Sequence, residues 1–211
     1  MLGTKILEER DSKYNGHLRV VKTLGLGTYI QAEGLTQSGG IVEDIWKQTL
    51  KRIYNLKFTI NNCLILGLGG GTAAKLVRKK WSGAKITGID IDPIMIELGR
   101  KYLGLDEVGL DIKVEDALET VEKLKRKNEK FDLIIVDLYN GDQFPEKFEN
   151  ENYMHLVRNI LARSGVAIFN QLYYDDKRSN TIRFGLKLQK VFSRVEYYYP
   201  EANLMFLCYN K

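Results

Sequence analysis

Cysteine and long apolar runs are both scarce in this chain. Of its 211 residues only Cys63 and Cys208 are cysteines, and each stands inside a short apolar segment. We therefore expect two buried thiols and no disulfide framework. No apolar run approaches the roughly 18 residues that suggest a membrane span. The first ten residues lack the apolar core of a signal peptide. These absences predict a cytoplasmic protein with no membrane contact.

Histidine and blocks of like charge are scarce as well. His17 and His155 have no ligand spacing with cysteines or acids, so we predict no metal site. The net charge of +5 is spread along the chain. The basic residues near 75–80 and 123–127 are typical of solvated helix faces, where a lysine in the last turn also favours the helix dipole. Aromatic and basic residues do not alternate, which argues against nucleic-acid binding.

The most informative stretch present is residues 62–72, where a short apolar run ends in closely spaced glycines. A predicted strand leads into Gly67, Gly69, Gly70 and Gly71, and a helical pattern begins at once from Thr72. This order places bare backbone and a helix N-terminus beside a ligand, as in sites for nucleotide-containing cofactors. Asp90 ends the next apolar run, where an acid can bind both hydroxyls of a ribose. The sequence therefore predicts a nucleoside site.

The glycine spacing alone fits two kinds of cofactor site. Gly69, Gly71 and Ala74 match the dinucleotide pattern G-x-G-x-x-A, while Gly67, Gly69 and Gly71 match the G-x-G-x-G of S-adenosylmethionine enzymes. The later predicted strands favour the S-adenosylmethionine pattern, because Asp116 and Asp137 also follow strand ends, where ligands of open α/β sheets bind. A dinucleotide enzyme would usually need a further substrate domain as well.

Apolar periodicity predicts alternating strands and helices from residue 62 onward. We expect a doubly wound, seven-stranded α/β sheet of the class I methyltransferase (Rossmann-like) type, ending in a pair of strands of which one is antiparallel. Residues 1–50 are expected to form a small β preface and the start of a linking helix, and 51–211 the cofactor-binding domain. The expected strands are 5–10, 17–22, 28–32, 62–66, 85–89, 110–114, 131–136, 165–169, 194–199 and 204–209. The expected helices are 41–56, 72–80, 93–102, 117–127, 150–162 and 179–191.

Four consecutive motifs resemble the spermidine synthase-like family of polyamine aminopropyltransferases and related methyltransferases. They are Leu64–Thr72, Gly88–Pro93, Glu115–Ala117 and Asp132–Asp137, and the preface adds Gln37, Glu43 and Trp46. The resemblance implies S-adenosylmethionine, or its decarboxylated form, as cofactor. It also implies a small-molecule substrate and Asp137 as the catalytic residue. The implied cofactor residues are Gly67, Gly69, Gly70, Gly71, Asp90, Ile91, Asp116, Ala117 and Gln37, and the implied substrate residues are Tyr139, Asn140 and Asp142.

Two departures from the aminopropyltransferase pattern affect the expected reaction. Gly70 stands where those enzymes carry an acid for the aminopropyl ammonium, so we expect its backbone N–H to face the carboxylate of intact S-adenosylmethionine. Asn140 stands where they carry a second acid, although Asp142 lies nearby and can substitute.

These departures lead us to expect methyl transfer to a small molecule. Aminopropyl transfer to a polyamine is the first alternative. A non-catalytic nucleoside-binding domain is the second alternative. Edge strands in the preface are compatible with a homodimer.

Overall fold

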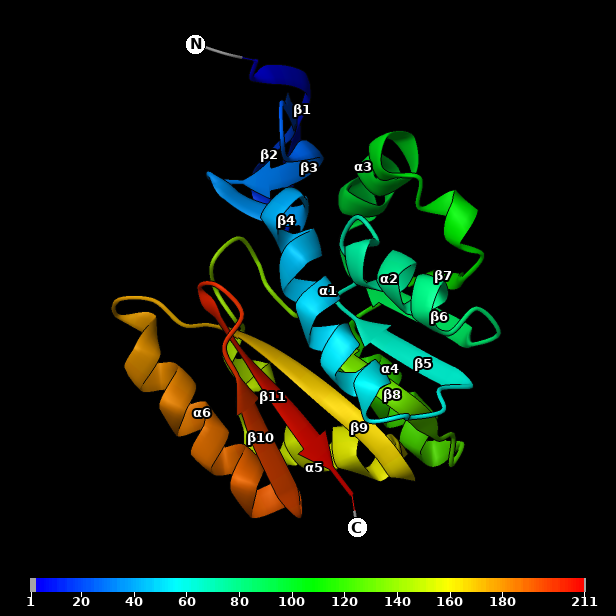
Figure 1. Ribbon diagram of the computed structural model, residues 1–211. Coiled ribbons are helices and arrows are strands. Elements are labelled where there is room, and N and C mark those ends of the chain that lie inside the picture. The colour runs from blue at the N-terminus through cyan, green and yellow to red at the C-terminus, as the bar shows by residue number, and fades with distance from the viewer. Residues whose placement is uncertain (1–2, 211) are drawn as a thin grey trace.

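The computed structural model describes residues 3–210, which form two β-sheets and the helices that surround them (Figure 1). The antiparallel N-terminal sheet contains, in order, β1 (Lys5–Ser12), β2 (Gly16–Thr23), β3 (Gly27–Ala32) and β4 (Leu35–Gly39). The larger sheet contains, in spatial order, β10 (Arg194–Tyr198), β11 (Asn203–Tyr209), β9 (Leu161–Leu172), β8 (Phe131–Val136), β5 (Asn62–Leu66), β6 (Lys85–Asp90) and β7 (Asp111–Val114).

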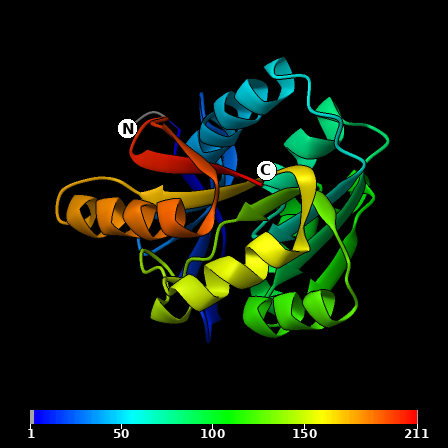
Figure 2. The same cartoon turned by 90° about the horizontal axis from the view of Figure 1, so that it is seen from below.

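Helices cover both faces of the larger sheet because its central strands are apolar on both sides (Figure 2). The helices are α1 (Gly40–Asn55), α2 (Thr72–Lys80), α3 (Pro93–Leu103), α4 (Ala117–Arg126), α5 (Glu151–Ile160) and α6 (Lys177–Val191), with short 3-10 turns at Asp106–Val108 and Glu146–Phe148. Leu64 and Leu66 of β5 pack toward α4, α5 and α6, whereas Cys63 and Ile65 pack toward α1 and α2.

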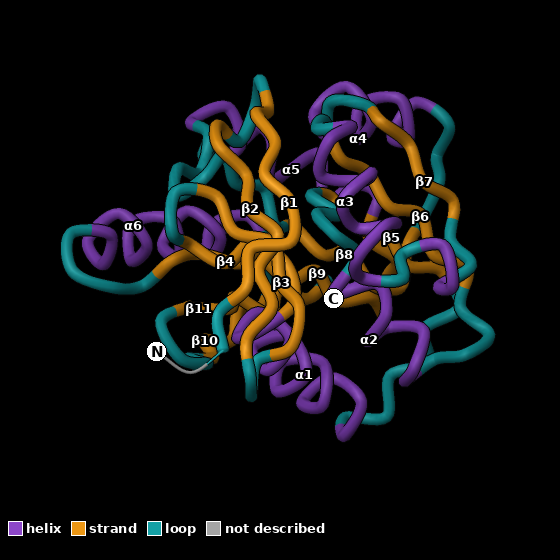
Figure 3. The backbone as a smooth tube through the Cα atoms, turned by 90° about the horizontal axis from the view of Figure 1, so that it is seen from above, coloured by secondary structure: helices purple, strands orange, loops and turns teal. Residues whose placement is uncertain are grey.

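The order of strands creates the position for a ligand. From β5 the chain winds outward through β6 and β7, and then returns to place β8 on the other side of β5. A crevice forms outside the carboxyl ends of the strands where this reversal occurs. The N-terminal sheet lies over the same end of the molecule and packs on α3, with Leu18, Val20 and Ile30 against Met95 and Leu98 (Figure 3).

The predicted fold class is confirmed, including the seven strands and the antiparallel orientation of one of the last two. That strand is β11, which pairs antiparallel with both β9 and β10. The sequence analysis missed β4. It also placed the end of the helix in 150–162 too late, because Leu161 already pairs with Phe131 as the first residue of β9. The expected domain division at residue 50 falls inside α1. Between residues 3 and 210, no helix has the length and apolar character needed to span a membrane.

Candidate functional site

A cavity of about 290 Å³ opens at the carboxyl ends of the central strands. Its floor is the loop after β5 together with the ends of β6 and β8. Its roof is β4, the β1–β2 turn and the first turns of α1. Seven of the predicted cofactor residues line it, namely Gln37, Gly67, Gly69, Asp90, Ile91, Asp116 and Ala117. Asp137, Tyr139 and Asn140 line it as well. The topology thus gathers residues that are more than 100 positions apart.

The glycine loop allows two strand ends to approach closely. Gly67 has a φ of 87°, and a Cβ atom there would lie 1.9 Å from the carbonyl oxygen of Asp137. The Gly67 and Leu68 amides both donate to the carbonyl of Ile89, at 2.9 Å. Only glycine fits where the ends of β5 and β8 meet in this backbone conformation. The loop is therefore held between β6 and β8, at the centre of the crevice.

Asp90 lies at the end of β6 with both carboxylate oxygens bonded to backbone amides. Gly69 N donates to Oδ2 at 2.7 Å, and Asp92 N donates to Oδ1 at 2.9 Å. Burial raises the pKa of Asp90 to about 6, although these amide bonds favour the ionised form. Each oxygen keeps a lone pair for a further donor. Asp90 can thus both fix the glycine loop and accept from ligand hydroxyls.

Gly70 and Gly71 do not line the cavity. The expectation that the Gly70 amide faces the carboxylate of S-adenosylmethionine is wrong, because this amide is already bonded within the protein. Gly70 N donates to Ser38 Oγ at 2.7 Å, and a Cβ at Gly70 would lie 2.7 Å from Leu103 Cδ1. Gly71 begins α2 with a φ of 90° and faces Leu105. Both glycines let the loop pack closely against its neighbours. They therefore affect a ligand indirectly, by fixing the conformation of the loop.

Asp116 follows β7 and lies on the cavity wall beside Ala117. Its Oδ1 caps α4 by accepting from Leu118 N at 2.8 Å, and its Oδ2 pairs with Lys147. Burial opposes ionisation of Asp116, but the Lys147 and helix amide bonds outweigh it and lower the pKa. An ionised Asp116 therefore remains at the edge of the cavity opposite Asp137.

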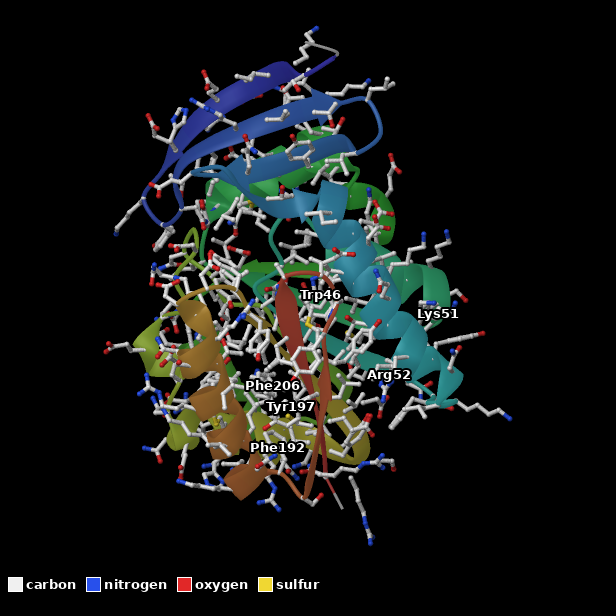
Figure 4. The ribbon with its side chains drawn as sticks, turned by 60° about the vertical axis from the view of Figure 1, so that its left-hand side comes forward. Trp46, Lys51, Arg52, Phe192, Tyr197 and Phe206 are labelled. Carbon is white, nitrogen blue, oxygen red and sulfur yellow. The ribbon has the colours of Figure 1, made fainter. Side chains whose placement is uncertain are left out.

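Asp137 follows β8 and is held by two side-chain donors. Asn170 Nδ2 donates to Oδ1 at 2.8 Å, and Trp46 Nε1 donates to Oδ2 at 3.3 Å. Trp46 is 1% exposed and lies beneath the N-terminal sheet, level with the upper end of β11 (Figure 4). Burial raises the pKa of Asp137 to about 6, and the two donors limit the rise. The carboxylate is thus ionised at neutral pH and can accept a proton.

The three predicted substrate residues are placed differently. Tyr139 lines the cavity, but its hydroxyl accepts from Leu172 N at 2.7 Å. Asn140 also lines it and pairs through its backbone with Gln143. Asp142 lies outside the cavity wall, because Lys177 Nζ holds its Oδ2 at 2.9 Å. The expectation that Asp142 substitutes for a missing acid is therefore wrong in this arrangement.

Sequence reasoning missed several polar residues of the site. Asn170 and Asn203 come from the ends of β9 and β11, and Ser38 from β4. Lys147, beside Asp116, is in a segment without apolar periodicity. The position of Asn170 was a usable signal, since this residue directly follows the expected strand 165–169 at the crevice end of the sheet. No local pattern pointed to Ser38, Asn203 or Lys147.

The residues present fit a nucleoside that carries a charged amino-acid tail. Asp90 offers acceptors for ribose hydroxyls, and Asp116 offers one for an exocyclic amine. Thr72 and Ala73 of α2 line the cavity, and no described side chain caps the amides of this helix N-terminus. Such an end attracts a carboxylate. S-adenosylmethionine combines these groups.

Comparisons with known proteins place this chain among relatives of similar sequence and fold. The family model described as "Spermine/spermidine synthase domain" matches residues 47–202. The polyamine aminopropyltransferase 1 of Hyperthermus butylicus is 27% identical over 78% of this chain. The eEF1A lysine and N-terminal methyltransferase homolog of Drosophila melanogaster is 26% identical over 69% of it. The structure of spermidine synthase from Thermotoga maritima matches 96% of this chain and 72% of that chain, with a TM-score of 0.77 and 18% identity.

These relatives are longer than the region they share with this chain. The match spans 59% of the Hyperthermus protein and 22% of the Drosophila protein. The family model nevertheless covers well over half of this chain, in the part that carries the glycine loop, Asp90, Asp116 and Asp137. The chain belongs to the spermine/spermidine synthase domain family, and the two curated relatives named above are an aminopropyltransferase and a methyltransferase homolog.

Proposed function

We propose that the chain is an S-adenosylmethionine-dependent methyltransferase that acts on a small molecule. The observation that carries the proposal is the uncapped N-terminus of α2 at the cavity wall, formed by Thr72 and Ala73. A carboxylate gains about 0.3–1 kcal/mol at such a helix end, and more where the site is partly buried. Intact S-adenosylmethionine has this carboxylate, and the decarboxylated form lacks it.

The residues of the site have the tasks that methyl transfer requires. The bound cofactor supplies a sulfonium with an electrophilic methyl carbon. Asp137 orients the acceptor for in-line attack and takes the proton that the acceptor loses. With S-adenosylmethionine bound, the acceptor would gain the methyl group, and the electron pair of the C–S bond would stay on sulfur. Trp46 and Asn170 hold Asp137 in place during this step.

Calorimetry with three ligands tests the proposal. S-adenosylmethionine, its decarboxylated form and methylthioadenosine share the adenosine and differ in the tail. We expect intact S-adenosylmethionine to bind tightest, because only its carboxylate reaches the α2 N-terminus. Tighter binding of the decarboxylated form would overturn the proposal in favour of aminopropyl transfer. Binding of methylthioadenosine alone would favour a nucleoside-binding role without catalysis.

Aminopropyl transfer to a polyamine is the second candidate. It is favoured by the names of the relatives, since the Hyperthermus protein is a polyamine aminopropyltransferase that matches 78% of this chain. The same cavity and Asp137 would serve, with attack on the carbon chain beside the sulfonium. Formation of spermidine from putrescine and decarboxylated S-adenosylmethionine is the product assay for this candidate.

A further inference from the structure

The half of the cavity that would receive the acceptor has an apolar wall. We define this acceptor half by its neighbours Asp137 and Trp46, and it is bounded by α1, β4 and the end of β9. The apolar side chains on its wall are Leu35, Ile41, Val42, Ile45 and Leu172. Val42 precedes Trp46 by one helical turn, so both project from the same side of α1. The wall therefore includes a residue one helical turn from Trp46, whose Nε1 donates to Asp137.

Acids are few in the acceptor half. Of the acids that line the cavity in the described chain, Asp90 ends β6, and Glu115 and Asp116 follow β7, which leaves Asp137 and Glu201 for the acceptor half. Glu201 is exposed in the turn between β10 and β11. Asp142 is paired with Lys177, and Glu43 lines a separate groove on the other side of α1. One partly buried carboxylate and one at the wet rim are thus available to an acceptor.

We infer that the acceptor is a monoamine with an apolar body, which places its nitrogen at Asp137 and its hydrocarbon along the α1 wall. This inference rests on the proposed function of the cavity. A second ammonium on the same molecule would lie against Val42 and Ile45, where its charge loses water without gaining a partner. If it turned instead to Glu201, the pair would be solvent-exposed, and exposed ion pairs contribute little.

The proton balance of the step agrees with one nitrogen at Asp137. An amine reaches the site as an ammonium and must lose one proton before its lone pair can attack. The Asp137 carboxylate takes that proton, and the neutral nitrogen then forms a bond to the methyl carbon while the C–S bond breaks. Asn170 and Trp46 each donate to a different carboxylate oxygen, so each oxygen keeps a lone pair that can take the proton.

Two amines of equal length test the inference. The protein is first saturated with S-adenosylhomocysteine, which has the same tail but no methyl group to transfer. Hexylamine and hexane-1,6-diamine are then titrated separately by calorimetry. We expect hexylamine to bind at least about tenfold tighter, because the second ammonium of the diamine must be desolvated against apolar side chains.

A matched pair of variants examines the wall itself. Val42→Glu adds an acid one turn from Trp46, whereas Val42→Gln adds a neutral side chain of the same size. We expect Val42→Glu to bind hexane-1,6-diamine tighter than hexylamine. We expect Val42→Gln to bind hexylamine tighter, as the unmodified protein does. Equal or tighter binding of the diamine to the unmodified protein would overturn the inference, as would binding of neither amine. Failure of the proposed function is seen separately, since S-adenosylhomocysteine would then not bind at the first step.

Discussion

At the scale of single residues, the orientation of the Asn170 side-chain amide determines whether Asp137 receives a hydrogen bond from it. Asn203 Nδ2 donates to Asn170 Oδ1 at 2.7 Å, and Asn170 Nδ2 donates to Asp137 Oδ1 at 2.8 Å. An amide has one donor end and one acceptor end. Because Asn203 occupies the acceptor end of Asn170, the donor end must face the carboxylate. Asn203 thus positions a residue that it does not touch.

Asn203→Asp is expected to reverse this arrangement. An aspartate cannot donate, so the Asn170 amide turns its donor end to residue 203 and its oxygen to Asp137. The pKa of Asp137, about 6, should then rise by about one unit. The acidic limb of the pH–rate profile would move upward by the same amount. Asn203→Ala is the control, since it leaves Asn170 free to keep donating. Identical profiles for both variants would contradict the role of Asn203.

Site residues could be predicted from the sequence where the signal is local, and could not be predicted where it depends on tertiary contacts. Asp90 and Asp137 could be located from sequence because each directly follows an apolar strand, and parallel strands end at one edge. The bond between Asn170 and Asn203 depends on the pairing of β9 with β11, which adjacent residues do not encode. Asp142 was misplaced because its loop has no periodicity, and its partner Lys177 belongs to a distant helix.

At the scale of elements, β4 connects the N-terminal sheet to the glycine loop. Ser38 Oγ accepts from Gly70 N, and Gly39 N donates to Thr72 Oγ1 at 2.8 Å. Most other elements were predicted closely, since apolar residues recur at strand or helix spacing within them. The segment Leu35–Gly39 contains a single large apolar residue, so no alternation marked it as a strand. Its pairing with β3 and its bonds to the loop define it instead.

The attachment of β1 to α3 is expected to weaken in acid. Glu8 bonds to Lys101, Tyr102 and Arg10, and the Lys101 and Tyr102 bonds lower its pKa from 4.5 to about 2. A lowered pKa contributes stability above pH 4.5 that is lost as the pH falls toward 2. Glu8→Gln should therefore reduce the free energy of unfolding by about 1 kcal/mol at pH 7, after allowing for solvent screening. Urea unfolding of the unmodified protein and of Glu8→Gln at pH 7 and pH 2.5 measures this difference in the free energy of unfolding.

A control on the same strand separates this effect from general loss of charge. Glu9 is more exposed and pairs with Arg19 on β2, without reaching α3. Glu9→Gln should change the free energy of unfolding far less than Glu8→Gln at pH 7. If the deficit of Glu8→Gln persisted unchanged at pH 2.5, ionisation of Glu8 would not be its source.

At the scale of the whole molecule, the N-terminal sheet is needed to complete the cavity. A chain of residues 40–211 would lose the roof residue Gln37 and the packing partners of Met95 and Leu98. Asp92 would also lose its bonds from Ser12 and Asn15. We expect this truncated chain to aggregate or to bind S-adenosylmethionine at least tenfold more weakly, because the buried carboxylate of Asp92 then keeps only the backbone amide of Ile94 as a donor. Calorimetry and light scattering measure both results, and unchanged monomeric binding would contradict the expectation.

The place of β11 has a consequence for biosynthesis. This strand is buried from Asn203 to Cys208 and lies between β9 and β10, so it fills the interior of the sheet although it follows every other strand in the chain. A nascent chain still held before residue 203 in the ribosome has β9 with an open edge, and Phe169 and Ile168 lack their neighbours there. Unpaired edges of this kind favour association with other chains. Translation speed through residues 203–209, and chaperones that shield β9 meanwhile, would therefore influence how much folded protein a cell obtains.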